Sequence, residues 1–206
     1  MGYSHYWYRP EKLDPERFAL WTDHVREIIK SSEANGIRIA GGDGTGEPSI
    51  TDTEVWFNGS VNQDIGVWTT NEDVVIPWFS DSANTQPEVA DPSVDKTDGV
   101  WYAGTLVSQR VAPVRNGIGS GDYETFCVNV EQEQSEWNKG EPLVFSCVKT
   151  ACRPYDLTVN AALVSFKHFF GDSVRVTSDG EPKDWIDGMV MCHNLFGYGM
   201  DFKLDG

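Results

Sequence analysis

The sequence predicts an α+β fold, in which a ferredoxin-like (split β-α-β) antiparallel sheet carries helices on one face and is interrupted by a long insertion. The first observation is the order of elements: without the insertion, the chain runs strand, helix, strand, strand, helix, strand, helix. The second is that two helices have a wide apolar face, as helices that cover a sheet need. The third is polar and apolar alternation in the strand segments, which is typical of strands with one buried face.

Length and composition favour one domain over residues 1–206. A chain of 206 residues with eight Trp can bury a sizeable core. Residues 60–122 have apolar anchors but poor periodicity. We therefore expect them to form an acidic insertion of short strands and loops, with residues 81–98 as the most mobile part.

The chain begins with aromatic residues 2–8, which predict a strand that stops at Pro10. Asp14 and Pro15 then have the pattern of an N-cap followed by a first-turn proline, which predicts a helix ending near Gly36. Its apolar stripe comprises Phe18, Trp21, Val25, Ile28 and Ile29. His24 falls off this stripe, so we expect it to face solvent.

Residues 37–40 and 53–57 predict two strands, and Asn58-Gly59 after them predicts a tight turn. The glycine-rich loop 41–46 is followed by Pro48 and strand-like residues instead of a helix, so it predicts a surface turn rather than a phosphate-binding loop. Calcium binding through oxygen atoms of this loop is an alternative, although the spacing is not that of an EF-hand.

A second helix is predicted to begin near Pro154, whose fixed φ suits a first turn, and to end at Gly171. Its apolar face comprises Tyr155, Val159, Ala162, Leu163, Phe166, Phe169 and Phe170. Residues 173–178 predict a strand, and residues 182–196 predict a last helix that ends at Gly197.

Lys149, Thr150 and Arg153 come just before the second helix. Unpaired N–H groups and the positive end of the helix dipole favour an anion there, and two cations and a hydroxyl add to that preference. The functional hypothesis is a small-ligand site for a phosphate, a nucleotide or another anion. The alternative is that the cations pair with Asp156, Asp172 or other acidic neighbours while Thr150 caps the helix.

His5, Tyr6 and Glu124 are the candidates for the other wall of this site. In a ferredoxin-like sheet, the first strand and the predicted strand 123–130 are central and close. His5 and Glu124 are thus the candidate catalytic residues, and Tyr6 is a candidate ligand-binding residue. The ordinary alternatives are a half-buried strand histidine and an exposed edge glutamate. No nucleophile elbow, P-loop or kinase signature occurs, so the sequence leaves open whether the protein is an enzyme.

The formal net charge is −16. This charge argues against direct binding to nucleic acid or to an anionic membrane, because both depend on Lys and Arg. Residues 41–122 hold thirteen Asp and Glu against Lys96, Arg110 and Arg115, a net charge of −10. The alternative function is therefore an acidic interaction module or nucleic-acid mimic that binds a basic protein partner through residues 41–122. A third interpretation is that acidity only maintains solubility.

Four cysteines are too few for a disulfide scaffold, and residues 1–5 lack the pattern of a secretory signal. We therefore expect reduced thiols in a cytoplasmic protein. Cys192-His193 has no partners at a usual zinc spacing, so we expect neither a metal nor a cofactor. No apolar run approaches the length of a membrane span.

Several short motifs of this chain also occur in a known group of sequences. They are GYSHYW at residues 2–7, FNG at 57–59, ETF at 124–126, KTACRPYD at 149–156 and SDG at 178–180. With these motifs the chain resembles an uncharacterised family of hypothetical proteins from fungi, bacteria and bacteriophages. The resemblance leaves out most of residues 60–122. It implies a single intracellular domain and brings no established activity.

Overall fold

The computed structural model describes residues 3–63, 100–102, 105–107, 120–135 and 140–205. The strands are β1 (Ser4–Arg9), β2 (Ile39–Ala40), β3 (Ser49–Ile50), β4 (Glu54–Gly59), β5 (Val100–Tyr102), β6 (Thr105–Val107), β7 (Phe126–Asn129), β8 (Val144–Lys149) and β9 (Arg175–Ser178). The helices are α1 (Pro15–Ala34), α2 (Asp156–Phe170) and α3 (Ile186–Phe196), with short 3-10 helices at Gly171–Ser173 and Pro182–Trp185.

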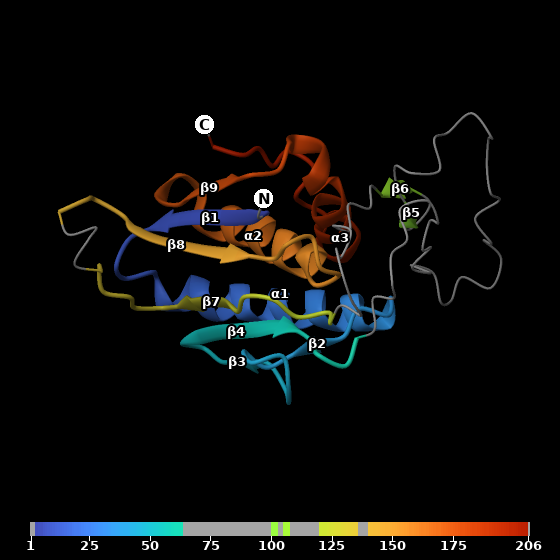
Figure 1. The fold of residues 1–206 in the computed structure, drawn as a ribbon. Helices are drawn as coiled ribbons and strands as arrows, with labels where there is room; N and C mark the ends of the chain where they lie inside the picture. Colours follow the sequence, from blue (N-terminus) through green and yellow to red (C-terminus); the bar gives the residue numbers. More distant parts are fainter. Residues whose placement is uncertain (1–2, 64–99, 103–104, 108–119, 136–139, 206) are drawn as a thin grey trace.

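All strand pairs among the described residues are antiparallel. One sheet has three strands in the order β8-β1-β9, a second has β4 paired with β2, β3 and β7, and β5 pairs with β6. Figure 1 shows α1 and α2 behind the strands of the first two sheets. The predicted α+β class with antiparallel sheets is confirmed. The specific ferredoxin-like order is not confirmed, because the described strands hydrogen-bond in separate sheets.

The three helices lie where periodicity and capping residues predict them. The Asp14 carboxylate accepts a hydrogen bond from the Arg17 backbone N–H and so caps α1. Helix α2 begins at Asp156, two residues after Pro154, and Gly171 follows its last residue with φ of 54°. Gly197 ends α3 in the left-handed conformation. In the described part of the chain, no helix is long and apolar enough to cross a membrane.

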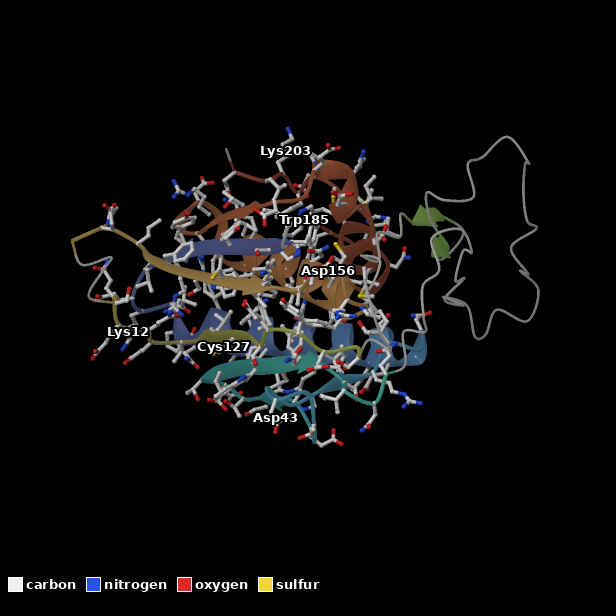
Figure 2. All side chains as sticks on the ribbon, in the orientation of Figure 1. Lys12, Asp43, Cys127, Asp156, Trp185 and Lys203 are labelled. Carbon is white, nitrogen blue, oxygen red and sulfur yellow. The ribbon has the colours of Figure 1, made fainter. Side chains whose placement is uncertain are left out.

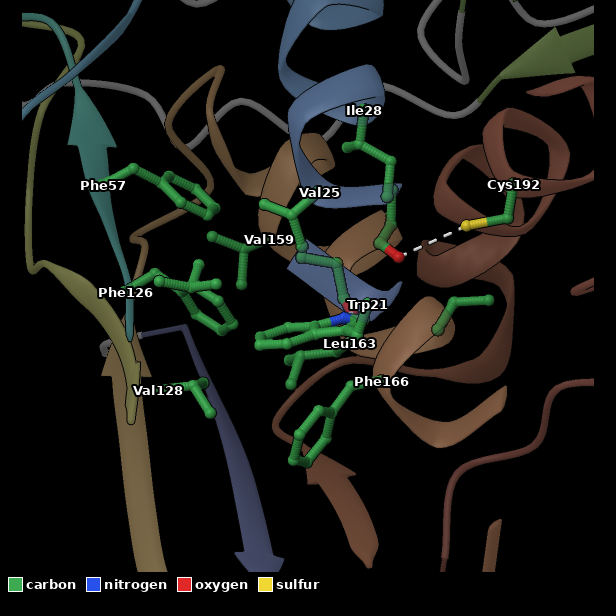
Figure 3. Packing of buried hydrophobic residues seen from close by; sticks show 14 of the residues in the cluster. Trp21, Val25, Ile28, Phe57, Phe126, Val128, Val159, Leu163, Phe166 and Cys192 are labelled. Atoms are coloured by element: carbon green, nitrogen blue, oxygen red, sulfur yellow. Dashed lines mark hydrogen bonds between the residues drawn. The ribbon is translucent and has the colours of Figure 1, made fainter. Parts of the chain in front are cut away.

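One hydrophobic cluster fills the space between the strands and the helices (Figure 3). Phe126 of β7 contacts Trp7 of β1 and Phe57 of β4, with ring centroids 5.2 and 5.0 Å apart. The Trp21 indole of α1 donates a hydrogen bond to the Ala162 carbonyl of α2 at 3.2 Å. The two sheets and the helices therefore share one core.

A buried arginine joins the edges of the two sheets. Arg9, at the end of β1, is fully buried, and its guanidinium donates to the carbonyls of Glu11 at 2.8 Å and Val130 at 3.0 Å. It also donates to the carbonyls of Pro10 and Asn129. Burial lowers the pKa of Arg9 to about 10, which leaves it charged at neutral pH. Four carbonyls thus compensate the desolvation of one cation.

The predicted turn at Asn58-Gly59 is wrong, because both residues belong to β4 and pair with β2. The buried Asn58 amide donates to the carbonyls of Gly42 and Tyr123, at 3.1 and 3.0 Å. A side chain at Gly59 would meet the Gly121 carbonyl oxygen at 2.1 Å. Asn58 and Gly59 therefore allow neighbouring loops to pack closely against β4, and the chain does not reverse direction at these residues.

The expectation that His24 faces solvent is also wrong. Its ring stacks on Phe196 with centroids 3.9 Å apart, and its Nδ1 lies 2.8 Å from the Tyr198 hydroxyl. Tyr198 in turn stacks on His168 at 3.7 Å. The sequence pattern of α1 alone does not show this contact, because Phe196, Tyr198 and His168 come from α2 and from the end of α3.

Replacing Arg9 with Met should lower the free energy of unfolding by about 3 kcal/mol, because buried carbonyls lose a charged donor. The matched control is Arg17→Met, since Arg17 lies exposed on α1 and its loss should change stability by about 0.5 kcal/mol or less. Urea denaturation measures both. Equal effects of the two substitutions would contradict the bridging role of Arg9.

The stability of the fold should depend on pH through His24. Burial, and then the nearby His168, lowers the pKa of His24 from its usual 6.5. Between the lowered pKa and 6.5 the unfolded chain binds more protons than the folded protein, so the free energy of unfolding falls as the pH drops below 6.5. Denaturation between about pH 5 and pH 7.5 measures this slope. His24→Phe should flatten it and His193→Gln should leave it unchanged; a slope untouched by His24→Phe would assign it to other groups.

Candidate functional site

The segment between β8 and α2 is a tight turn in an uncommon conformation. The Arg153 N–H donates to the Thr150 carbonyl at 3.0 Å, and the residues between them, Ala151 and Cys152, have φ of 51° and 55°. Positive φ is rare outside glycine and stores strain of about 1 kcal/mol or more per residue. The N–H groups of Thr150 and Ala151 both donate to the Tyr3 carbonyl at 3.1 Å, which holds the turn against β1. Strain of this kind is typical of functional sites.

Asp156, the first residue of α2, is the centre of a polar network. Its Oδ1 lies 2.7 Å from His5 Nε2 and also accepts the Thr150 hydroxyl. Its Oδ2 accepts from the Asn160 amide at 3.3 Å. On its other side, the His5 ring has Nδ1 2.9 Å from the Ser178 hydroxyl. One carboxylate therefore links β1, β9, the strained turn and α2.

The His5 side chain is enclosed by aromatic rings. It is fully buried, and the rings of Tyr3 and Trp185 meet it edge-on with centroids 5.1 and 4.9 Å away. Asp156 and Trp185, both labelled in Figure 2, are thus two of the residues that contact the His5 side chain. Burial, and then the Asp156 carboxylate, raises the pKa of the Tyr3 phenol well above its usual value, so it stays protonated at neutral pH.

Arg153 is a partly buried cation that forms no ion pair with another described residue. Its Nε and Nη1 atoms are buried and have no hydrogen-bond acceptor. Within the described residues neither Arg153 nor Lys149 forms an ion pair, so pairing with Asp156 or Asp172, the alternative interpretation of these cations, does not occur there. The Lys149 ammonium lies 5.8 Å from the Tyr123 ring centroid.

Two other candidate residues, Thr150 and Glu124, have different partners: Thr150 belongs to the network around Asp156, and Glu124 does not. Thr150 is buried, and its hydroxyl is engaged by Asp156. The exposed Glu124 accepts the Lys149 N–H at 2.7 Å through its carboxylate and the Tyr155 hydroxyl at 2.6 Å through its carbonyl. Glu124 thus contacts the end of β8 and not His5.

Tyr6 lies on the opposite face of β1 from His5, since side chains alternate along a strand. Its hydroxyl donates to the Asp179 carboxylate at 3.0 Å, and its ring stacks on Phe145. The structure therefore brings together His5, Thr150 and the start of α2, whereas Tyr6 and Glu124 have separate partners.

Sequence reasoning missed Ser178 and the central role of Asp156. Ser178 is level with His5 because β1 and β9 pair in the register His5↔Ser178. The two residues are 173 positions apart, so no local spacing connects them. Only the pairing of β1 with β9 could have connected His5 to Ser178, and this pairing identifies the contact only once the strand register is known.

Other predicted features have a structural account or lie outside the described residues. Loop 41–46 is a surface turn in which Asp43 accepts hydrogen bonds from Thr45. Among the described residues no group of three or more metal-ligating side chains exists, and none of the four cysteines is in a disulfide bond. Most of the acidic segment 41–122, including residues 81–98, lies outside the described ranges.

A pocket of about 560 Å³ lies between the end of α1 and loop 45–47. Its lining includes Glu33, Arg38 and Glu47. Burial, and then Glu47, raises the pKa of Glu33. No residue of the network around Asp156 lines this pocket. Apart from the raised pKa of Glu33, nothing about Glu33 and Glu47 indicates that this pocket binds a ligand.

Comparison with protein-family models, with curated proteins and with solved structures finds no match for this chain. The resemblance of the terminal motifs to a family of hypothetical proteins therefore stays a prediction. Function has to be inferred from the site itself.

If the turn at 151–152 is strained, glycine should relieve the strain. Ala151→Gly and Cys152→Gly should each leave the free energy of unfolding unchanged or raise it by up to about 1 kcal/mol. The control is Ala161→Gly in the middle of α2, which should lower it by about 1 kcal/mol or more. Urea denaturation gives the sign of each change. A loss of stability at residue 151 as large as that at residue 161 would contradict the strain.

Proposed function

We propose that this protein binds a small anionic ligand at Arg153, in the corner where β8 turns into α2. The observation that carries the proposal is the pair of buried guanidinium nitrogens, Nε and Nη1, that have no acceptor. A cation removed from water without a partner costs several kcal/mol, and a bound anion recovers that energy through charged hydrogen bonds.

One further feature supports an anion at this corner. Lys149, two residues before the strained turn, adds a second positive charge without an ion-pair partner among the described residues. The ligand classes that fit are phosphates, nucleotides and carboxylates.

We also infer that the fold is a modified split β-α-β arrangement. The support is that β1 lies between β8 and β9 and that α1 follows β1 while α2 joins β8 to β9. In this arrangement the turn 150–153 and the end of β9 lie at the same end of the sheet. The ligand corner would then be a property of the fold rather than of one loop.

The acidic interaction module stays an alternative hypothesis. Its residues lie mostly outside the described ranges, and no observation in the described part of the chain favours it over ligand binding. Its partner would be a basic protein, bound with strong dependence on salt.

The anion site predicts a specific response of Arg153 variants. The probes are inorganic phosphate, citrate and AMP, tested by thermal shift and titration calorimetry on the full chain. At least one should raise the melting temperature, and Arg153→Gln should weaken its binding by about tenfold or more, while Arg153→Lys keeps part of the affinity. Arg17→Gln, an exposed change on α1, should leave binding unchanged.

The same variants separate a binding role from a structural one. Without ligand, Arg153→Gln should be at least as stable as the original protein, since it removes an unpaired, partly buried charge. A loss of more than about 1 kcal/mol would show that Arg153 supports the fold. Equal binding of all three probes to Arg153→Gln, or binding of none to the original protein, would contradict the proposed function.

A further inference from the structure

The network around Asp156 contains a hydroxyl that the proposed anion site does not use. Ser178 Oγ lies 2.9 Å from His5 Nδ1, and His5 Nε2 lies 2.7 Å from Asp156 Oδ1. The carboxylate is held in turn by Thr150 and Asn160. Hydroxyl, imidazole and carboxylate therefore stand in line, with both imidazole nitrogens engaged.

The hydrogen-bond partners define where the protons lie when the imidazole is neutral. An ionised Asp156 can only accept, so the ring proton is on Nε2 and Nδ1 has a free lone pair. Ser178 Oγ accepts the Gly180 N–H at 2.9 Å, and the Tyr3 phenol also hydrogen-bonds to Ser178. The hydroxyl proton has His5 Nδ1 at 2.9 Å and the Ser4 carbonyl at 3.4 Å as acceptors. The shorter contact assigns the hydroxyl proton to His5 Nδ1. Oriented in this way, the imidazole is a base directed at a hydroxyl.

Ser178 is less enclosed than His5. It is partly exposed at the end of β9, and among the described strands β9 pairs with β1 alone. The Asp156 side chain is 17% exposed, whereas His5 is fully enclosed. His5 is thus shielded from solvent, whereas Ser178 and Asp156 are partly exposed.

We propose that Ser178 is the nucleophile of an acyl-transfer site, with His5 as its general base and Asp156 as the positioning residue that orients His5. Ser178 Oγ attacks the carbonyl carbon of an ester and passes its proton to His5 Nδ1. The C–O bond of the ester breaks, and the leaving alkoxide takes that proton. Water then attacks the acyl-serine, gives a proton to His5, and His5 returns it to Ser178 as the acid leaves.

The surroundings of Ser178 define the class of substrate. The carboxylates of Asp179, Glu181 and Asp184 follow it closely in the chain, and aromatic Tyr3 and Trp185 flank His5. Glu181 pairs with Lys183 at 2.9 Å, so Asp179 and Asp184 are the charges that would repel an anionic acyl group. The site therefore suits a carboxylic ester with a neutral or cationic acyl group. The proposal does not depend on the anion site at Arg153.

The test is covalent labelling of the intact protein with an uncharged alkyl fluorophosphonate. Attack by Ser178 forms a P–O bond, breaks the P–F bond and releases fluoride, which leaves a stable mass increment. Peptide mass spectrometry should place one adduct on Ser178. The labelling rate should rise with pH and then level off, as reaction through a general base requires.

Variants separate reactivity from exposure. His5→Gln should slow labelling by about a hundredfold or more, and Asp156→Asn should slow it and change its pH profile. Ser173→Ala is the matched control: Ser173 is exposed and bonds to the Phe170 carbonyl, so this change should leave the rate unaltered. Circular dichroism checks that each variant is folded.

Folded original protein that carries no adduct on Ser178 would overturn the proposal, whatever the variants do. So would labelling of Ser178 at the same rate in folded His5→Gln or Asp156→Asn. If neither variant folds, the pH profile of the original protein decides: a rate that rises without levelling off, as for a free hydroxyl, would contradict activation by His5. Loss of phosphate or citrate binding in Arg153→Gln would not bear on this result.

Discussion

The contact between the Asp156 carboxylate and the His5 imidazole is the interaction on which this end of the molecule depends. His5 is fully buried, so both of its ring nitrogens need partners inside the protein. Asp156 supplies one of them from the first turn of α2, where a negative charge is favoured by the helix dipole. It also accepts the Thr150 hydroxyl, which comes from the strained turn. Without the carboxylate, the turn would lose a tether and the histidine an acceptor.

The polar groups in this corner differ in whether they have hydrogen-bond partners. The groups around Asp156 are engaged with one another, which fixes their geometry. Arg153, a few residues away in sequence, has buried nitrogens without acceptors. The described part of the chain contains many carboxylates, so an arginine that forms an ion pair with none of them is informative. We infer that the fold keeps Arg153 for a partner from outside the chain.

The parts of the fold that follow from local chemistry could be predicted from the sequence. Helix α1 was predictable because Asp14 and Pro15 mark its start and its apolar residues recur at helical spacing. Strand β1 was predictable from its aromatic residues and from Pro10, and β9 was predictable from alternation and from the turn residues up to Gly180. The turn predicted at Asn58-Gly59 was wrong, because this dipeptide is typical of turns but here both residues belong to β4 and pack against loops.

The site was predictable only in part. The chemistry of residues 149–153 indicated an anion site, and His5 stood out as a candidate base. What joins His5 to Ser178 and Asp156 is strand register and the docking of α2, which are tertiary properties. The same limit applies to His24, whose aromatic partners come from α2 and the end of α3. Local patterns determine which elements form, whereas long-range packing determines which side chains meet.

The most direct test of the central claim is the protonation state of His5, measured by nitrogen NMR of the imidazole in the intact protein at neutral pH. The proposed acyl-transfer role requires a neutral ring with its proton on Nε2, bonded to Asp156, and a bare Nδ1 that accepts the Ser178 hydroxyl. Protons on both nitrogens, or on Nδ1 alone, would contradict it. In either case Ser178 would accept from His5 instead of donating to it, and the network would support the fold without activating a nucleophile.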